Sequence, residues 1–285
     1  YKMNPFEISK GFFLYFRNLE NIIFMKKITW LLTLLACINL YAQKSADEQI
    51  DEIKKEGIRL YNSEMASWHG TDLFIEQYPT KEKIGGYFSY SENHKNICTF
   101  YSKDKNPKVI GTITFNDQFE LDKAIIDLTE RNFKINESNI YNLRTIAQNI
   151  VENDTVLFKH YNNTKYNLIP LIDKDVNKVY ILTGPAVSGV VIFGNDYLLT
   201  FNKKNELISK KSLHKNIIPI EFGDNEQEVE STMHSHLPET GDFLTPTDIC
   251  TLMLYGKYTS WKNHLVVSKN YINMWMIHDN SYEIM

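Results

Sequence analysis

Apolar residues recur at helical spacing in four parts of the chain, at 45–66, 117–130, 136–152 and about 246–259. The clearest stripe lies in 136–152, where apolar side chains return every three or four positions and so line one face of a helix. The first segment carries a similar pattern among Asp, Glu and Lys residues. It is followed at 68–72 by Trp, His, Gly, Thr and Asp, a composition that predicts a turn.

Runs of β-branched and aromatic residues between these segments predict strands. They cover 86–90, 97–101, 109–115, 156–158, 167–172, 179–183, 189–194, 197–201, 206–208, 229–236, 264–268 and 272–277. The run 189–194 is apolar throughout, as expected of a strand that is buried on both faces. Strands and helices do not alternate in a regular βαβ order, so the pattern predicts a mixed α+β fold.

A leader is predicted near the N-terminus. Residues 25–27 read Met-Lys-Lys, residues 28–40 are mostly apolar, and residues 41–43 read Tyr-Ala-Gln. This order is typical of a secretory signal peptide, which has a short positively charged region, a short apolar region and a cleavage site with a small residue. We therefore expect residues 25–43 to direct export to the periplasm or beyond, and we expect no stable membrane span in the mature chain.

The leader divides the rest of the chain into segments. Residues 1–24 are interpreted as an upstream extension, and an alternative to the signal peptide is a lipoprotein whose Cys37 carries the lipid. The mature chain is expected to hold an N-terminal α+β domain at 44–175 and a second domain at 176–285. This boundary rests on the change of pattern, because no flexible linker marks it.

Charge and cysteine content narrow the possible functions. The net charge is -4 and no basic stripe occurs, so nucleic-acid binding has no electrostatic support. After removal of the leader only Cys98 and Cys250 remain, too few for a disulfide framework. We expect Cys250 to be a buried free thiol on a helix face. The sequence leaves the oligomeric state open.

Two imidazoles and one carboxylate can converge in the segment 233–248. His234 and His236 are two residues apart on a predicted strand, so their side chains point to the same face. Asp248 follows after a short loop, at the predicted start of a helix. Two histidines and a carboxylate with one position left for water form a recognised catalytic zinc site. We therefore predict that these three residues bind Zn²⁺.

Simpler interpretations of the same residues stay open. An ordinary helix start also explains these residues. Thr245 would supply the capping hydroxyl, Pro246 the first-turn proline, and Asp248 a carboxylate that accepts a hydrogen bond from the backbone of the capping residue. A pair of histidines on a strand is often merely solvated or buried. His214 is a further candidate ligand, and a fourth protein ligand would convert an open catalytic site into a closed structural one.

The order His-x-His, loop, Thr-x-x-Asp, helix and apolar strand resembles the JAMM/MPN-type (JAB) metallopeptidases. The resemblance assigns His234, His236 and Asp248 to zinc and gives Thr245 the place of the serine that assists the tetrahedral intermediate. Residues 189–194 and 264–268 are similar to core strands of that family. The resemblance covers roughly 180–285 and implies hydrolysis of a peptide or isopeptide bond.

The sequence departs from the family pattern at the general base. The family has a glutamate just before the upstream strand, whereas 186–188 read Ala-Val-Ser. The proline after the second histidine is displaced by Leu237, and the loop before Asp248 is one residue longer. Proton transfer by a positioned side chain contributes about 10²–10⁴-fold to a rate. Among the nearby acids, we expect Glu239 and Asp242, in the loop between the ligands, to take this role.

Two functions therefore remain in view. The first is an exported zinc peptidase that acts on a peptide or protein substrate. The second is a recognition module of the cell envelope whose metal is structural or absent, with a ligand-binding groove in the N-terminal region. The cluster of Glu64, Trp68, His69 and Asp72 is a candidate for such a groove, or else a capped helix end.

Overall fold

A computed structural model describes residues 26, 46–223 and 229–285 of the chain. The upstream extension, Cys37 and, apart from Lys26, the leader lie outside the described residues. The chain divides into two compact units, Tyr1–Glu52 and Ile53–Met285, and most of the described residues belong to the second. Among the described residues, no helix is both long enough and apolar enough to cross a membrane.

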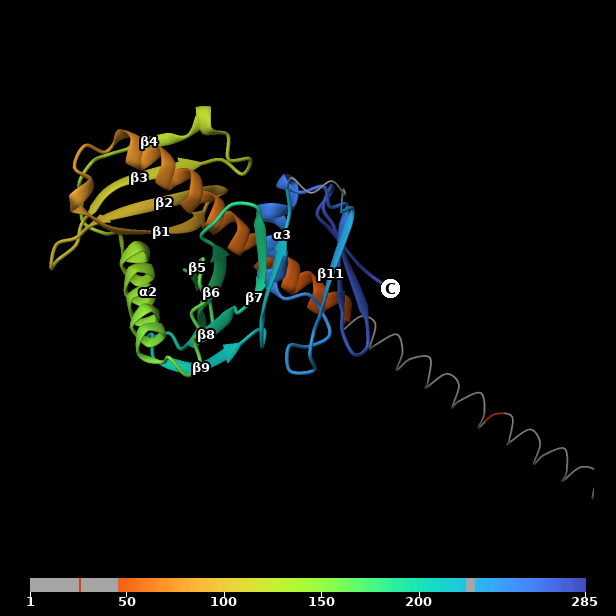
Figure 1. The fold of residues 1–285 in the computed structure, drawn as a ribbon. Helices are drawn as coiled ribbons and strands as arrows, with labels where there is room; N and C mark the ends of the chain where they lie inside the picture. The colour runs from red at the N-terminus through yellow and green to blue at the C-terminus, as the bar shows by residue number, and fades with distance from the viewer. Residues whose placement is uncertain (1–25, 27–45, 224–228) are drawn as a thin grey trace, which may run out of the picture. The chain divides into compact units, whose positions relative to one another are not determined.

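The second unit begins with a helix that continues to residue 77 (Figure 1). The predicted turn at 68–72 is therefore wrong, because these residues are helical. The helix buries Leu60 and Phe74 in a core cluster. Gly70 permits close contact with the adjacent sheet, since a Cβ there would lie 2.6 Å from the Cβ of Cys98. Packing of this face explains why the helix persists through residues of turn-like composition.

An antiparallel sheet follows, with strands β1 (Ile84–Glu92), β2 (Lys95–Ser102), β3 (Val109–Phe115) and β4 (Ile125–Asp127). The predicted strands at 86–90, 97–101 and 109–115 are confirmed. The predicted helix at 117–130 is wrong. Phe119 adopts a left-handed φ of 55°, and the Asn116 side chain accepts a hydrogen bond from the Glu120 amide at 3.2 Å. These turn features end any helix before β4.

Helix α2 (Ile135–Asn153) confirms the prediction at 136–152 and packs on β5 (Thr164–Ile172) and β6 (Asn177–Pro185). Strands β8 (Tyr197–Phe201) and β9 (Leu207–Ser212) complete this sheet in the order β5-β6-β8-β9. The boundary predicted near residue 175 falls in the connection of the β5–β6 hairpin and stays a prediction.

The strand predicted at 156–158 is wrong. These residues form a turn in which the Leu157 amide donates to Asp154 Oδ1 at 3.1 Å and the Phe158 amide donates to Asp154 O at 3.1 Å. Phe158 nevertheless belongs to the core beneath α2. A buried aromatic side chain thus gave a strand-like pattern to a turn.

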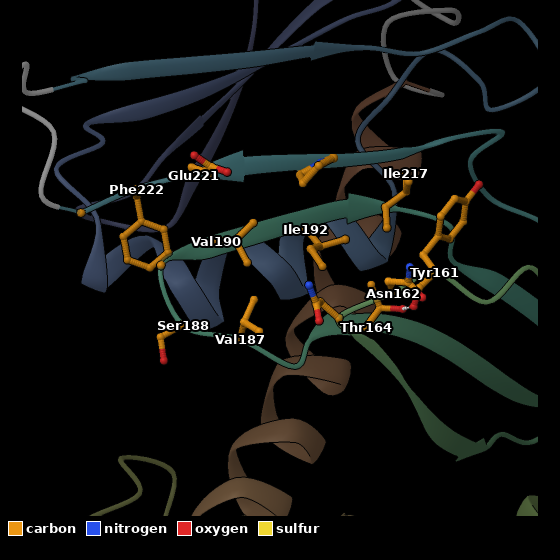
Figure 2. Close-up of a pocket in the computed structure, with 14 residues that line it drawn as sticks. Tyr161, Asn162, Thr164, Val187, Ser188, Val190, Ile192, Ile217, Glu221 and Phe222 are labelled. Carbon is orange, nitrogen blue, oxygen red and sulfur yellow. Dashed lines mark hydrogen bonds between the residues drawn. The ribbon is translucent and has the colours of Figure 1, made fainter.

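Strands β7 (Val190–Gly194) and β10 (Ile217–Glu221) pair antiparallel in a separate two-stranded sheet. One face packs Val191 and Phe193 into a core cluster. The other face turns Val190 and Ile192 toward a cavity (Figure 2). The expectation that 189–194 is buried on both faces therefore holds only in part.

The last sheet has the order β11-β12-β13-β14, with β11 (Ser231–Ser235), β12 (Asn263–Val267), β13 (Ile272–Met276) and β14 (Ser281–Ile284). Strands β11 and β12 are parallel, and α3 (Pro246–Tyr255) lies between them in the chain. The helix packs against β7. Within residues 46–223 and 229–285, three α-helices and four small sheets confirm a mixed α+β fold.

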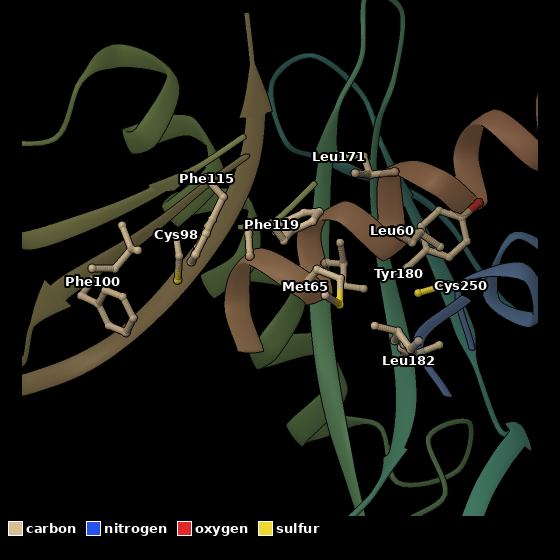
Figure 3. Packing of buried hydrophobic residues seen from close by; sticks show 14 of the residues in the cluster. Leu60, Met65, Cys98, Phe100, Phe115, Phe119, Leu171, Tyr180, Leu182 and Cys250 are labelled. Atoms are coloured by element: carbon tan, nitrogen blue, oxygen red, sulfur yellow. The ribbon is translucent and has the colours of Figure 1, made fainter. Parts of the chain in front are cut away.

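One core cluster joins the first helix to the β1–β4 and β5–β6 sheets and to α3 (Figure 3). Cys98 and Cys250 both lie in this cluster as free, fully buried thiols, which confirms the expectation for Cys250. Burial raises the pKa of both thiols, so both are neutral and unreactive.

Candidate metal centre

Strand β11 delivers the paired histidines to one buried point. His234 lies in the strand between the exposed Met233 and Ser235, and His236 follows directly after its end. The His236 amide extends the pairing by donating to Val267 O at 2.8 Å. Both imidazoles therefore lie on the inner face, with their Nε2 atoms 3.1 Å apart.

Helix α3 supplies the carboxylate at its third position. Asp248 Oδ2 accepts hydrogen bonds from the Thr245 amide and hydroxyl, both at 2.8 Å, and Thr245 Oγ1 accepts from the Asp248 amide. This is a capping box with Pro246 in the first turn. The other oxygen, Oδ1, is buried without a hydrogen-bond partner and lies 3.7 Å from His234 Nε2. Helix capping and a place beside the histidines are thus compatible.

A third histidine joins them. His214 follows β9 and precedes β10, and its Nε2 lies 3.2 Å from His236 Nε2 and 3.3 Å from Asp248 Oδ1. The four ligand atoms of His214, His234, His236 and Asp248 lie within 4.8 Å of one another. The group is closed to solvent, since no more than 5% of any of these side chains is exposed.

The spacing of these atoms suits one tetrahedral ion. Ligands about 2.0–2.1 Å from zinc at tetrahedral angles lie about 3.3–3.4 Å from one another. The Nε2 atom of His236 lies 3.1 and 3.2 Å from those of the other two histidines and 3.3 Å from Asp248 Oδ2, and the Nε2 atoms of His214 and His234 lie 3.3 and 3.7 Å from Asp248 Oδ1. A buried carboxylate oxygen without a hydrogen bond is costly unless something else satisfies it. These four residues could therefore hold a metal ion.

Neighbouring side chains orient the imidazoles. His234 Nδ1 lies 2.8 Å from His264 Nε2, and His264 Nδ1 lies 2.8 Å from Thr232 Oγ1. With the Nε2 lone pair of His234 reserved for a metal, its Nδ1–H donates to His264, which donates in turn to Thr232. On the other side, the carboxylate of Asp196 lies 4.0 Å from His214 Nδ1.

The electrostatics favour the metal-binding protonation state at His234 and Asp248 and oppose it at His214. Burial lowers the pKa of His234 to about 4, and burial also lowers that of His264 to about 3. For Asp248, burial opposes ionisation, but the nearby histidines outweigh it and hold the pKa well below its ordinary value. For His214, burial lowers the pKa, but Asp248 outweighs it and raises the pKa. Neutral His234 and ionised Asp248 are the forms that bind metals.

The residues predicted to act in catalysis lie apart from this arrangement, except for Thr245. The Thr245 hydroxyl is buried and engaged by Asp248 and Thr247. The Asp242 carboxylate accepts a hydrogen bond from Asn270 at 2.7 Å, and Glu239 is exposed. Neither carboxylate belongs to the group of convergent ligand atoms. Their proposed roles in proton transfer stay predictions.

Two members of this site had weak signals in the sequence. His214 lies twenty residues before His234 in a connection between short strands, so no ligand spacing identified it. His264 appeared only within an apolar strand, and its role depends on the parallel register that pairs it with Thr232. Strand order, which sequence periodicity does not give, brings both into place.

No protein-family model, curated protein or solved structure matches this chain. The resemblance to the JAMM/MPN-type metallopeptidases therefore stays a prediction. The residues of the site itself therefore indicate the function.

Proposed function

We propose that this chain is a zinc-binding protein in which the metal stabilises a recognition module. One observation carries the proposal: His214, His234, His236 and Asp248 place four buried ligand atoms within reach of a single ion. The ligands come from separate segments, namely the β9–β10 connection, β11 and α3. An ion there would bind these segments to one another.

The ligand set favours zinc over other common ions. Three imidazoles and one carboxylate suit a borderline ion that accepts four ligands at tetrahedral angles. Calcium and magnesium prefer six or more oxygen ligands or a largely hydrated octahedral site. Neither of the buried thiols belongs to the ligand group, so soft-metal chemistry has no support there.

Four protein ligands favour a structural role. Catalytic zinc ordinarily keeps three protein ligands and an open position for water, whereas structural zinc is closed. His214, whose Nε2 lies 3.3 Å from Asp248 Oδ1, would supply the fourth ligand here. Burial of all four side chains further argues against access by a peptide substrate.

A zinc peptidase is the second candidate, favoured by the order of His234, His236 and Asp248 in the chain. It would require His214 to leave the metal and a carboxylate to approach the vacated position. Glu239 and Asp242 are the acids in the intervening loop. A hydrolase of this kind would gain, or at least keep, activity when His214 is replaced.

Metal analysis combined with digestion of a peptide library separates the two candidates. We expect about one zinc per chain and no zinc-dependent cleavage in the wild type, in His214→Ala or in the control Glu239→Gln. Cleavage that is removed by chelation and by His236→Ala would overturn the structural role in favour of the peptidase. Absence of bound metal in protein prepared without chelator would overturn both.

A further inference from the structure

A cavity of about 700 Å³ opens between the first helix, the β6–β7 connection and the end of α3. Glu64, Trp68 and Tyr87 line it from one side, and Tyr255 and Tyr258 from another. Its size lies within the range of about 300–1,000 Å³ typical of ligand sites. None of the four candidate metal ligands lines it, so this cavity is separate from the metal centre.

Among the described residues, Glu64 is the one carboxylate that lines this cavity. Its Oε2 accepts a hydrogen bond from Asn167 Nδ2 at 2.8 Å. Within 46–223 and 229–285 no lysine, arginine or histidine forms an ion pair with it. Burial raises the pKa of Glu64 to about 7, an effect that Asn167 and the more distant Arg144 only partly offset. A cationic group in the cavity would supply the missing counter-charge.

Aromatic rings surround this carboxylate. Trp68 is 41% exposed and Tyr258 is 52% exposed, with ring centroids 6.2 Å apart and planes tilted by 44°. Burial raises the pKa of Tyr87 and Tyr255, and Glu64 raises it further, so both phenols stay neutral. Neutral aromatic faces attract ammonium and guanidinium groups and pack well against their alkyl stems.

A second cavity of about 630 Å³ adjoins the first and shares the lining residues 187–190 and Phe222 (Figure 2). Val190 and Ile192 of β7 face into it from the two-stranded sheet, and Val187 and Thr164 lie opposite (Figure 2). This neighbouring surface is apolar along Val190 and Ile192 and polar at Asn162 and Glu221. A ligand longer than one side chain therefore has room to continue along it.

From these contacts we infer that the first cavity binds the basic side chain of a peptide. Its cationic head would meet Glu64, and its alkyl stem would lie against Trp68 and Tyr258. A neutral saccharide would satisfy the aromatic rings but leave the Glu64 carboxylate without a counter-charge. The inference names the ligand of the proposed recognition module and rests on that proposed function, but the cavity itself does not require zinc.

Titration calorimetry with blocked single amino acids tests this inference. The probes are N-acetyl-lysine methylamide, N-acetyl-arginine methylamide, their neutral counterpart N-acetyl-norleucine methylamide, and chitotriose. We expect at least one cationic probe to bind at least tenfold more tightly than norleucine or chitotriose. Glu64→Gln should weaken that binding at least tenfold and Trp68→Ala several-fold.

Glu76→Gln is the matched control, since it changes an exposed carboxylate on the same helix. It should leave binding unchanged. Glutamine keeps an acceptor for Asn167, and a thermal unfolding scan of each variant checks that it folds. Equal affinity for lysine, arginine and norleucine, no effect of Glu64→Gln in the folded protein, or preference for chitotriose would each overturn the inference. Repeating the titration after chelation separates the two proposals, because cation binding without zinc upholds this one alone.

Discussion

Removal of zinc should lower the thermal stability of this protein substantially. An ion that binds only the folded state stabilises it by about 4 kcal/mol when its free concentration is a thousand times the Kd. For a unit of this size, 1 kcal/mol shifts the Tm by about 2–4 °C. The structure predicts the source of this loss, since without the ion Asp248 Oδ1 is buried with no hydrogen-bond partner. We therefore expect chelation to lower the Tm by about 8–16 °C.

The measurement is differential scanning calorimetry of protein prepared without chelator, then with EDTA, then with zinc restored. Asp248→Asn should abolish most of the zinc-dependent shift, and His214→Ala, which leaves three ligands for the ion, should reduce it. Asparagine at 248 keeps an oxygen that can accept from the Thr245 amide, so the start of α3 is preserved. Glu239→Gln, in the exposed part of the intervening loop, should retain the full shift. A shift below about 2 °C in the wild type, or an undiminished shift in Asp248→Asn, would refute this reasoning.

Two further predictions concern positions around the site and in the fold. His264→Ala removes the hydrogen-bond partner of His234 and should weaken zinc binding about 10–100-fold, measured by competition with a fluorescent chelator; unchanged affinity would contradict the orienting role. Arg131→Ala removes two hydrogen bonds, of 2.6 and 2.7 Å, from the buried Glu137 and should cost about 2 kcal/mol in urea unfolding. Burial alone would raise the pKa of Glu137, but Arg131 outweighs it and lowers the pKa. The pair's contribution is therefore present above the carboxyl's ordinary pKa and lost as pH falls through the lowered one, so a wild-type stability no greater than the variant's at neutral pH would contradict it.

Local patterns predicted those elements whose own residues determine them. Helix α2 followed from periodicity because it buries one regular face, and strands β1 to β3 followed from their β-branched and aromatic residues. The segment 117–130 failed because a left-handed Phe119 is not visible in an apolar pattern. The turn predicted at 68–72 failed for the opposite reason, since packing against the sheet overrode a turn-like composition.

The spacing of residues along the chain likewise identified some members of the candidate site and not others. His234 and His236 share a strand face, and Asp248 begins a helix, so all three were identifiable from spacing. His214 entered only as an open alternative, because the fold of the β9–β10 connection decides where it points. That single residue changes the interpretation from an open catalytic site to a closed one.

X-ray absorption at the zinc edge tests the central claim most directly. We expect zinc bound by three imidazole nitrogens and one carboxylate oxygen, all at about 2.0–2.1 Å, with the imidazole scattering reduced by one third in His214→Ala. Protein without zinc, or zinc bound by only two imidazoles with His214→Ala leaving the spectrum unchanged, would contradict it.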